Sequence, residues 1–360
     1  MFDRLHPAIK EATRLTRAGH IAEATALLRH MLRGKTAWQE RMPIEQSVFK
    51  ESVFDASAFS GPGLEEPDLV LDGGRFVERV YANQAGRRTY KLFIPAGRQE
   101  RSMPLVVMLH GCTQCPDDFA AGTRMNFQAE QQGCCVAYPG QPATANPSKC
   151  WNWFNPGDQK RDEGEPSLIA GITRQIIGDE AIDPRRVYVA GFSAGGAAAA
   201  IMAAAYPDLY AAVGVHSGLA CGAAHDLPSA LAAMRQDGTL AFSGCTPGPT
   251  TGNRSSVPMI VFHGDQDKTV HPRNGDLVAA QAQSATRDSG MEQGRVPGGH
   301  AYSRTIRRDA SGRPVLEQWV IHGAGHAWSG GSPAGSYTDP QGPDAAREML
   351  RFFLEHAQDT

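Results

Sequence analysis

Apolar and polar positions form two kinds of pattern along the chain, and these predict strands and helices in turn. Six apolar runs have strand length and are rich in β-branched or aromatic residues: 105–109, 134–138, 187–191, 211–215, 259–263 and 317–321. Between them lie longer stretches typical of helices, at 117–132, 166–180 and 194–205. Continuous apolar runs are typical of buried parallel strands, because helices cover both faces of their sheet. We therefore predict a doubly wound, mostly parallel α/β sheet.

The N-terminal part of the chain differs from this alternating body. Residues 1–34 show helical spacing on both sides of Gly19, which predicts a helical hairpin extension. Residues 35–74 contain a stretch rich in glycine, proline and acidic residues and are expected to be a linker. Two alternating runs at 76–81 and 89–94 predict an antiparallel hairpin at the N-terminal edge of the sheet. The main globular domain is thus expected to span residues 75–358.

Composition and charge exclude several classes of protein. Of the 360 residues, 41% are hydrophobic and 20% are charged, a balance that can bury a core. The formal net charge of −3, without a run dense in lysine or arginine, does not fit a nucleic-acid-binding protein. No apolar run reaches the roughly 18 residues of a membrane span. The first residues lack the apolar core of a signal peptide, so we expect a cytoplasmic protein, or export by a route that the N-terminus does not reveal. The oligomeric state stays open.

A serine with the setting of a nucleophile follows the run at 187–191. The sequence Gly191-Phe192-Ser193-Ala194-Gly195 has the G-x-S-x-G pattern, between a predicted strand and an alanine-rich predicted helix. In that setting a sharp turn lifts the serine hydroxyl out of the backbone, and the glycines avoid collisions of Cβ atoms with neighbouring elements. The alternative is a structural serine at a glycine-rich helix start. Ser193 is the predicted nucleophile.

A serine nucleophile needs a base and an acid, which in this arrangement follow it in the order serine, acid, histidine. Asp265 and Asp267 both follow the run at 259–263, and we choose Asp267; the alternative is an Asx turn, in which the carboxylate only binds local amides. His322 and His326 follow the last run, and we choose His326, because its glycine-rich loop can return to the site. The intervening glycines and the lack of an H-E-x-x-H pattern argue against zinc.

The transition state needs hydrogen-bond donors for a developing oxyanion. Backbone N–H groups after an early strand and after the nucleophile supply them in this type of site, so we assign Cys112 and Ala194. Cys112 and Cys115 also form a C-x-x-C pair, the setting of a dithiol oxidoreductase. If the chain were a dithiol oxidoreductase, Ser193, Asp267 and His326 would have no role in its reaction.

The seven cysteines permit several pairings. Cys150 can pair with Cys112 or with Cys115, and Cys221 can pair with Cys245; the sequence does not decide between these possibilities. Cys134 and Cys135 fall in a predicted buried strand and are more simply core residues. An odd total leaves at least one cysteine unpaired.

Taken together, these motifs resemble a known family. HGCTQ at 110–114, CWNWF at 150–154, the segment around GFSAGG at 191–196, HGDQDKTV at 263–270 and GAGHAWSGG at 323–331 are similar to the poly(3-hydroxybutyrate) depolymerase family of esterases. This family lies close to the feruloyl and acetylxylan esterases within the α/β-hydrolases. The resemblance spans about residues 75–355 and implies an α/β-hydrolase fold.

The resemblance also implies an activity and a set of site residues. Ser193 would be the nucleophile, Asp267 the acid, His326 the base and Cys112 an oxyanion donor. The substrate groove is expected to be lined by His110, Gln114, Trp151, Trp153 and Trp328. The expected substrates are esters: polyhydroxyalkanoate chains or oligomers and short-chain esters, with feruloyl or acetylxylan esters as the alternative, and a non-catalytic hydrolase-fold binding protein as a further one. No metal or organic cofactor is implied. Secreted depolymerases of this kind carry an export signal and often a polymer-binding module, and neither is seen in this sequence.

Overall fold

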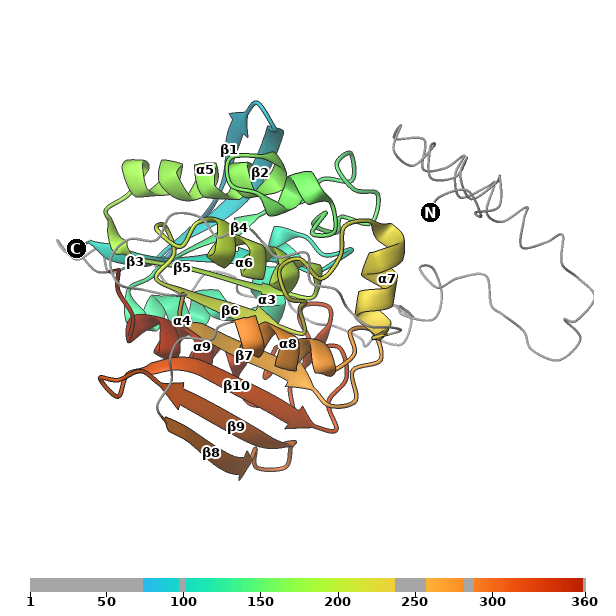
Figure 1. The fold of residues 1–360 in the computed structure, drawn as a ribbon. Coiled ribbons are helices and arrows are strands. Elements are labelled where there is room, and N and C mark those ends of the chain that lie inside the picture. Colours follow the sequence, from blue (N-terminus) through green and yellow to red (C-terminus); the bar gives the residue numbers. More distant parts are fainter. Residues whose placement is uncertain (1–73, 97–101, 237–256, 282–287, 359–360) are drawn as a thin grey trace, which may run out of the picture. The chain divides into compact units, whose positions relative to one another are not determined.

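The computed structural model describes residues 74–96, 102–236, 257–281 and 288–358 (Figure 1). The predicted helical extension at 1–34 and all but the last residue of the predicted linker at 35–74 lie outside these residues. Within the described residues, ten strands form one sheet in the order β1-β2-β4-β3-β5-β6-β7-β10-β9-β8. A second, two-stranded sheet joins β11 and β12.

The strands of the main sheet differ in direction between its centre and its two edges. Their bounds are β1 Arg75–Asn83, β2 Gly86–Ile94, β3 Met103–Leu109, β4 Cys135–Pro139, β5 Ile182–Phe192, β6 Ala212–His216, β7 Met259–Gly264, β8 Asp288–Arg295, β9 Ala301–Arg308 and β10 Pro314–His322. Parallel pairing runs from β4 through β3, β5, β6 and β7 to β10. The pairs β1–β2, β2–β4, β9–β10 and β8–β9 are antiparallel. The predicted mostly parallel sheet with an antiparallel N-terminal edge is confirmed, and the C-terminal edge is antiparallel as well.

Helices cover both faces of the sheet, as Figure 1 shows. The helices are α3 Pro116–Thr123, α4 Met125–Gln132, α5 Gly164–Asp179, α6 Ala194–Ala205, α7 Leu227–Arg235, α8 Arg273–Gln281 and α9 Ala345–Leu354, with a short 3₁₀ turn at Pro156–Gln159. Residues of α5, α6 and α8 share one hydrophobic core with every second residue of β3, such as Leu105 and Val107. Residues of α3, α4 and α9 share the other core with the alternate residues Val106 and Met108. The strand side chains therefore point alternately into two cores.

Two local features differ from the predictions. The expected helix at 117–132 is split into α3 and α4, because Arg124 takes a left-handed conformation (φ +54°) between them. Strands β8 and β9 were not predicted, because 288–295 and 301–308 carry many polar residues. In β9, Ile306 is buried and Tyr302 packs partly buried against the core. None of the helices in the described part of the chain combines the length and apolar character needed to cross a membrane.

Candidate active site

Ser193 occupies a strained turn between β5 and α6. Its φ of +56° and ψ of −119° lie outside the regions that non-glycine residues ordinarily adopt. A Cβ at Gly191 would overlap the carbonyl of Gly195, and a Cβ at Gly195 would overlap the carbonyl of Leu109. Only glycine therefore permits this close approach of strand and helix, as the G-x-S-x-G pattern predicts. The Ser193 hydroxyl is presented at the carboxyl end of the parallel strands.

The structure brings Ser193, His326 and Asp267 into one hydrogen-bonded chain. Nε2 of His326 lies 2.9 Å from Oγ of Ser193, and Nδ1 of His326 lies 2.7 Å from Oδ2 of Asp267. Phe192 packs against the His326 ring at a centroid distance of 4.8 Å. With the Nδ1 proton donated to the carboxylate, Nε2 is left to accept the proton of the serine hydroxyl. The three residues are thus hydrogen-bonded in the order that a nucleophile, a base and an acid require.

Asp267 is buried and surrounded by hydrogen-bond donors, which favour its ionised carboxylate. Its Oδ1 accepts hydrogen bonds from the backbone N–H groups of Thr269 (2.9 Å) and Val270 (2.8 Å). Burial opposes ionisation, but hydrogen bonds from His263 and His326 outweigh it and hold the pKa of Asp267 well below its usual range. The Asp267 carboxylate therefore makes both of the interactions considered from the sequence. It forms an Asx-type turn with local amides, and it binds His326.

Two buried histidines in the site were not predicted from the sequence. Nε2 of His263 donates to the carbonyl of Val270 (2.8 Å) and lies 3.4 Å from Oδ2 of Asp267, the same oxygen that His326 contacts. His216 accepts a hydrogen bond from the N–H of Ser329 (3.0 Å), and burial lowers its pKa well below the usual value. His263 is the first letter of the H-G-x-x-D motif, and its contacts to Asp267 and Val270 lie within the same segment. His216 contacts Ser329, 113 positions away, and carries no local sequence signal.

The alternative acid and base candidates also pair, but with each other. Nδ1 of His322 lies 3.0 Å from Oδ2 of Asp265, and the N–H of Gly323 donates to Oδ1 of Asp265 (2.7 Å). The structure therefore separates the four candidates into two pairs, and only the pair chosen from the sequence reaches Ser193.

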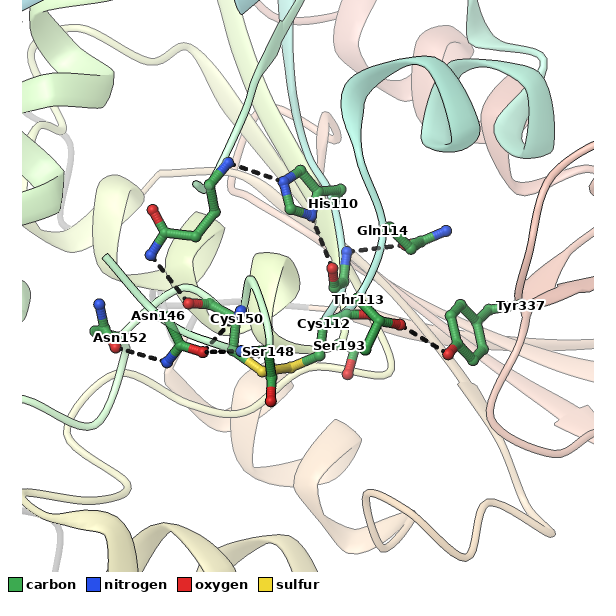
Figure 2. Close-up of a disulfide and its surroundings, with 12 residues drawn as sticks. His110, Cys112, Thr113, Gln114, Asn146, Ser148, Cys150, Asn152, Ser193 and Tyr337 are labelled. Atoms are coloured by element: carbon green, nitrogen blue, oxygen red, sulfur yellow. Dashed lines mark hydrogen bonds between the residues drawn. A yellow bond between two sulfur atoms is a disulfide. The ribbon is translucent and has the colours of Figure 1, made fainter. Parts of the chain in front are cut away.

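Of the two predicted oxyanion donors, Cys112 is held by a covalent link. Cys112 lies directly after the turn that follows β3, and its side chain forms a disulfide with Cys150 (Figure 2). Figure 2 places Ser193 beside this disulfide. Ala194 is the first residue of α6, where a helix leaves its N–H groups without intrahelical acceptors. Among the described residues, no acceptor is bonded to the N–H of Cys112 or of Ala194, so both are available for an oxyanion.

The structure decides one of the cysteine pairings that the sequence left open. The structure pairs Cys150 with Cys112, not with Cys115, which is a free thiol. Cys134 and Cys135 are buried, in agreement with their prediction as core residues. Cys221 is also disulfide-bonded; Cys245, the partner considered for it, lies outside the described residues.

His110 and Gln114 form hydrogen bonds with the backbone of the turn after β3 and with its neighbours. Nδ1 of His110 donates to the carbonyl of Gly111 (2.7 Å), while Nε2 accepts from the N–H of Gln141 (3.1 Å). Oε1 of Gln114 accepts from the N–H of Gly111 (2.9 Å), and its Nε2 donates to Asp118 (2.8 Å). Burial lowers the pKa of His110 to about 4, so its ring is neutral. Both side chains are almost fully buried, and their role in substrate binding stays a prediction.

The three tryptophans predicted to line the substrate groove are all buried, and their contact with substrate stays a prediction. Trp151 and Trp328 are fully buried; Trp328 stacks on His216 at a centroid distance of 5.0 Å. Trp153 is also buried, but it belongs to a small cluster with Ala194 that adjoins the nucleophile. A tryptophan near a catalytic motif gives no sequence signal that separates a groove wall from a core residue, because both environments favour a large aromatic ring.

A tyrosine that was not predicted closes the other side of the site. The hydroxyl of Tyr337 lies 2.9 Å from Oγ1 of Thr113, and its ring stacks on Phe192 at 6.4 Å (Figure 2). Thr113 and Tyr337 both have positive φ, 66° and 54°. Their contact joins the oxyanion turn to the loop that follows β11 (Trp328–Ser329).

Behind the oxyanion turn lies a buried carboxylate, Glu165, which sequence reasoning did not single out. Its Oε2 accepts from the N–H of Asn152 (2.7 Å), and its Oε1 accepts from Nδ2 of Asn152 (2.7 Å) and from Nε2 of Gln141. Nε2 of Gln141 also donates to the carbonyl of Cys150 (3.0 Å). Burial, with the nearby charge of Asp158, raises the pKa of Glu165 to about 7. This network fixes the segment that carries Cys150.

The described residues include no group of three or more histidine, cysteine, aspartate or glutamate side chains arranged to hold a metal ion.

The fold defines the class of protein, an α/β-hydrolase, and the candidate site has the serine, histidine and aspartate that this fold commonly carries. Among solved structures, an acetyl xylan esterase from Aspergillus awamori superposes with a TM-score of 0.62 at 20% identity, covering 78% of this chain and 99% of that chain. This similarity establishes the α/β-hydrolase fold.

Within that class, the chain belongs to the esterase PHB depolymerase family, whose family model matches residues 88–289. It is 34% identical over 241 residues to poly(3-hydroxyalkanoate) depolymerase C of Paucimonas lemoignei, covering 65% of this chain and 56% of that protein. It is 33% identical over 267 residues to feruloyl esterase B of Neurospora crassa, covering 69% of this chain and 82% of that protein. The chain thus spans little more than half the length of the depolymerase and most of the length of the feruloyl esterase.

Proposed function

We propose that this chain is a serine esterase that hydrolyses carboxylic esters through an acyl-enzyme on Ser193. The observation that carries the proposal is the unbroken chain of hydrogen bonds from Asp267 through His326 to the hydroxyl of Ser193. A non-catalytic binding protein with the same fold has no need for a strained serine, a buried charged aspartate and a neutral acceptor nitrogen between them.

The reaction proceeds in two steps. His326 removes the hydroxyl proton while Oγ of Ser193 attacks the ester carbonyl, and Asp267 stabilises the imidazolium that forms. The N–H groups of Cys112 and Ala194 donate to the tetrahedral oxyanion. His326 then protonates the leaving alcohol, whose bond to the carbonyl carbon breaks. Water attacks the acyl-enzyme in the same way and releases the acid and the free serine.

As substrates we propose poly(3-hydroxybutyrate) and related polyhydroxyalkanoate chains or oligomers, together with short-chain esters. The family membership and the similarity to a poly(3-hydroxyalkanoate) depolymerase support this choice. A feruloyl esterase is the second candidate, because the chain covers more of the Neurospora crassa feruloyl esterase B, 82%, than of the depolymerase, 56%.

The test compares the wild-type chain with Ser193→Ala on 3-hydroxybutyrate oligomers, p-nitrophenyl butyrate and methyl ferulate. We expect the wild type to hydrolyse the oligomers with the highest kcat/KM, and the variant to lose about 10³-fold or more of kcat. A highest kcat/KM on methyl ferulate would favour the second candidate. A folded variant that retains a tenth of the wild-type turnover would place the nucleophile elsewhere.

A further inference from the structure

A second serine, histidine and aspartate form a hydrogen-bonded chain outside the candidate active site. Nε2 of His322 lies 2.9 Å from Oγ of Ser303, and Nδ1 of His322 lies 3.0 Å from Oδ2 of Asp265. The order of atoms, from carboxylate to Nδ1 and from Nε2 to hydroxyl, is the same as in the chain that ends at Ser193. No step of the proposed ester hydrolysis uses these three residues.

Three neighbouring strands place these residues together. His322 is the last residue of β10, and Asp265 directly follows β7, the parallel neighbour of β10. On the other side of β10, Ser303 of β9 pairs with Val320 in the antiparallel register. Residues two apart in a strand share a face, so the side chains of Val320 and His322 point to the same side as that of Ser303. The contact is therefore set by the register of the sheet and does not depend on the conformation of a long loop.

The carboxylate orients the imidazole for proton acceptance. Partial burial opposes ionisation of Asp265, but hydrogen bonds from the N–H of Gly323 and from His322 outweigh it and lower the pKa of the carboxyl. An ionised Asp265 holds the proton of His322 on Nδ1, which leaves Nε2 as the acceptor for the hydroxyl proton of Ser303. The side chain of His322 is 43% exposed, so reagents in solution can approach this group.

We propose that Ser303 is a second acylation site, which takes acyl groups from small activated carboxylic esters such as aryl acetates. Oγ of Ser303 attacks the acyl carbon, and the bond from that carbon to the aryloxide breaks. The hydroxyl proton passes to Nε2 of His322 and from there to the aryloxide, which leaves as the phenol. The products are an O-acylated Ser303 and one phenol, with no oxidant or cofactor required.

The surroundings of Ser303 indicate a single acylation and not sustained turnover. Ser303 lies in the middle of β9, between β10 and β8, where antiparallel pairing uses the backbone N–H groups. The described residues offer it no helix start of the kind that supplies the N–H of Ala194 to Ser193. Without oxyanion stabilisation, hydrolysis of the unactivated acyl-serine is slow. The expected signature is a burst of phenol followed by a negligible steady rate.

The experiment uses the full chain carrying Ser193→Ala, so that the hydroxyl of the candidate active site cannot react. This protein is treated with p-nitrophenyl acetate and, separately, with a fluorophosphonate, and the modified residue is located by peptide mass spectrometry. Three further proteins add Ser303→Ala, His322→Gln or Thr305→Ala to the same background. Thr305 is a matched control, because it lies two residues along the same strand on the same face.

We expect acetyl and phosphonyl groups on Ser303 in the parent and in the Thr305→Ala protein, and none at this position after Ser303→Ala. His322→Gln should slow the labelling of Ser303 at least about tenfold, since general-base assistance is lost. An unlabelled Ser303 in the parent overturns the proposal, and so does labelling that is equally fast with and without His322. Because the assay reads an adduct in a chain without the Ser193 hydroxyl, its outcome is separate from that of the ester hydrolysis proposed above.

Discussion

At the scale of the residue, two aspartates only two positions apart are given different tasks by their surroundings. Asp267 is 4% exposed and faces His326, with two backbone amides on its other oxygen. Asp265 is more exposed and faces His322 at the outer side of the same loop. A buried charge that loses a partner costs far more than an exposed one, because water cannot replace the lost hydrogen bond.

Substitution of each of the two aspartates should therefore lower kcat by very different factors. We expect Asp267→Asn to lower kcat on a short-chain ester about 10⁴-fold, since the amide no longer holds the tautomer of His326 that accepts the serine proton. Asp265→Asn should lower kcat less than about tenfold, because an exposed pair contributes little to the position of its neighbours. Steady-state kinetics on p-nitrophenyl butyrate measures both. The reverse ranking would show that the acid of the site is Asp265.

His263 should influence His326 through Asp267, which contacts both histidines. Its Nε2 is 3.4 Å from Oδ2 of Asp267, the same oxygen that binds His326, and this donor is the strongest of the influences that lower the pKa of the aspartate. In His263→Gln the carboxylate loses stabilisation and interacts more strongly with the imidazolium of His326. We expect the acidic limb of the kcat/KM profile to move to higher pH, with a loss in kcat of about tenfold.

If His263→Gln acted only by disturbing the packing of the protein, the pH profile would not change in this way. His356 is a buried histidine whose ring nitrogens face the carbonyls of Phe352 and Pro314, away from the acid loop, and His356→Gln is the matched control. Loss of packing alone would lower the amount of active protein in either variant and leave the pH profile in place. An unmoved acidic limb in His263→Gln would contradict the coupling.

At the scale of the element, the oxyanion turn is fixed from two sides. The disulfide ties Cys112 to Cys150, and the N–H of Thr113 donates to the carbonyl of Ser148 (2.7 Å). On the opposite side, Gln114 binds both the backbone of the turn and helix α3 (Pro116–Thr123) through Asp118. The turn therefore keeps several noncovalent contacts that do not depend on the disulfide.

Removal of the disulfide should lower the stability of the protein but change its turnover only slightly. In Cys112→Ser/Cys150→Ser, loss of a link between residues 38 positions apart should lower the free energy of unfolding by about 2–4 kcal/mol. Turnover of p-nitrophenyl butyrate well below the melting temperature should fall less than about tenfold. Urea unfolding and steady-state kinetics give the two quantities. Loss of one oxyanion donor costs about 10²–10³-fold, so a fall of that size would mean that the bridge itself positions the N–H of Cys112.

The elements and residues that the sequence predicts are those specified by local pattern. The strands that became β3, β5 and β7 are continuous apolar runs, and the turn of Ser193 requires glycines at fixed spacing. Strands β8 and β9, the last two strands at one end of the sheet, were missed, because strands with many polar side chains have no distinctive hydrophobic pattern. The support by Glu165 and Tyr337 was missed for a different reason: each acts through partners distant in the chain. His263 lies four residues before Asp267, but nothing in the H-G-x-x-D pattern indicates that its ring faces the carboxylate. The pattern of the sequence specifies the nucleophile better than it specifies what holds the site in place.

At the scale of the whole molecule, the sheet separates two hydrophobic cores, and a carboxylate is buried at the edge of one of them. Glu165 is 6% exposed, within α5 (Gly164–Asp179), and faces Asn152, Gln141 and, at 3.6 Å, the guanidinium of Arg88. These donors compensate only part of the cost of burying its charge, because its pKa remains raised, to about 7. The folded protein therefore binds a proton there more tightly than the unfolded chain does.

This linkage predicts how stability changes with pH. The pKa of Glu165 is raised from 4.5 to about 7 on folding, so its contribution is fully present below pH 4.5 and is lost as the pH rises through 7. The loss is on the order of 3 kcal/mol in the free energy of unfolding. His110, whose pKa is lowered to about 4, has the opposite effect between pH 4 and 6.5, so the wild-type curve alone does not isolate Glu165.

A comparison with Glu165→Gln removes that overlap, since the variant keeps His110 and lacks the titrating carboxyl. We expect urea unfolding at pH 5 and pH 8 to show a fall in the wild-type free energy that exceeds the fall in the variant by about 3 kcal/mol. At pH 5 the wild type should be the more stable protein, because its neutral carboxyl fits the same donors with less crowding than an amide NH₂ group. Glu355→Gln, at an exposed position beyond α9 (Ala345–Leu354), should follow the wild-type curve. Parallel changes in the wild type and in Glu165→Gln would mean that Glu165 is already ionised in the folded protein at pH 5, held by Asn152 and Arg88.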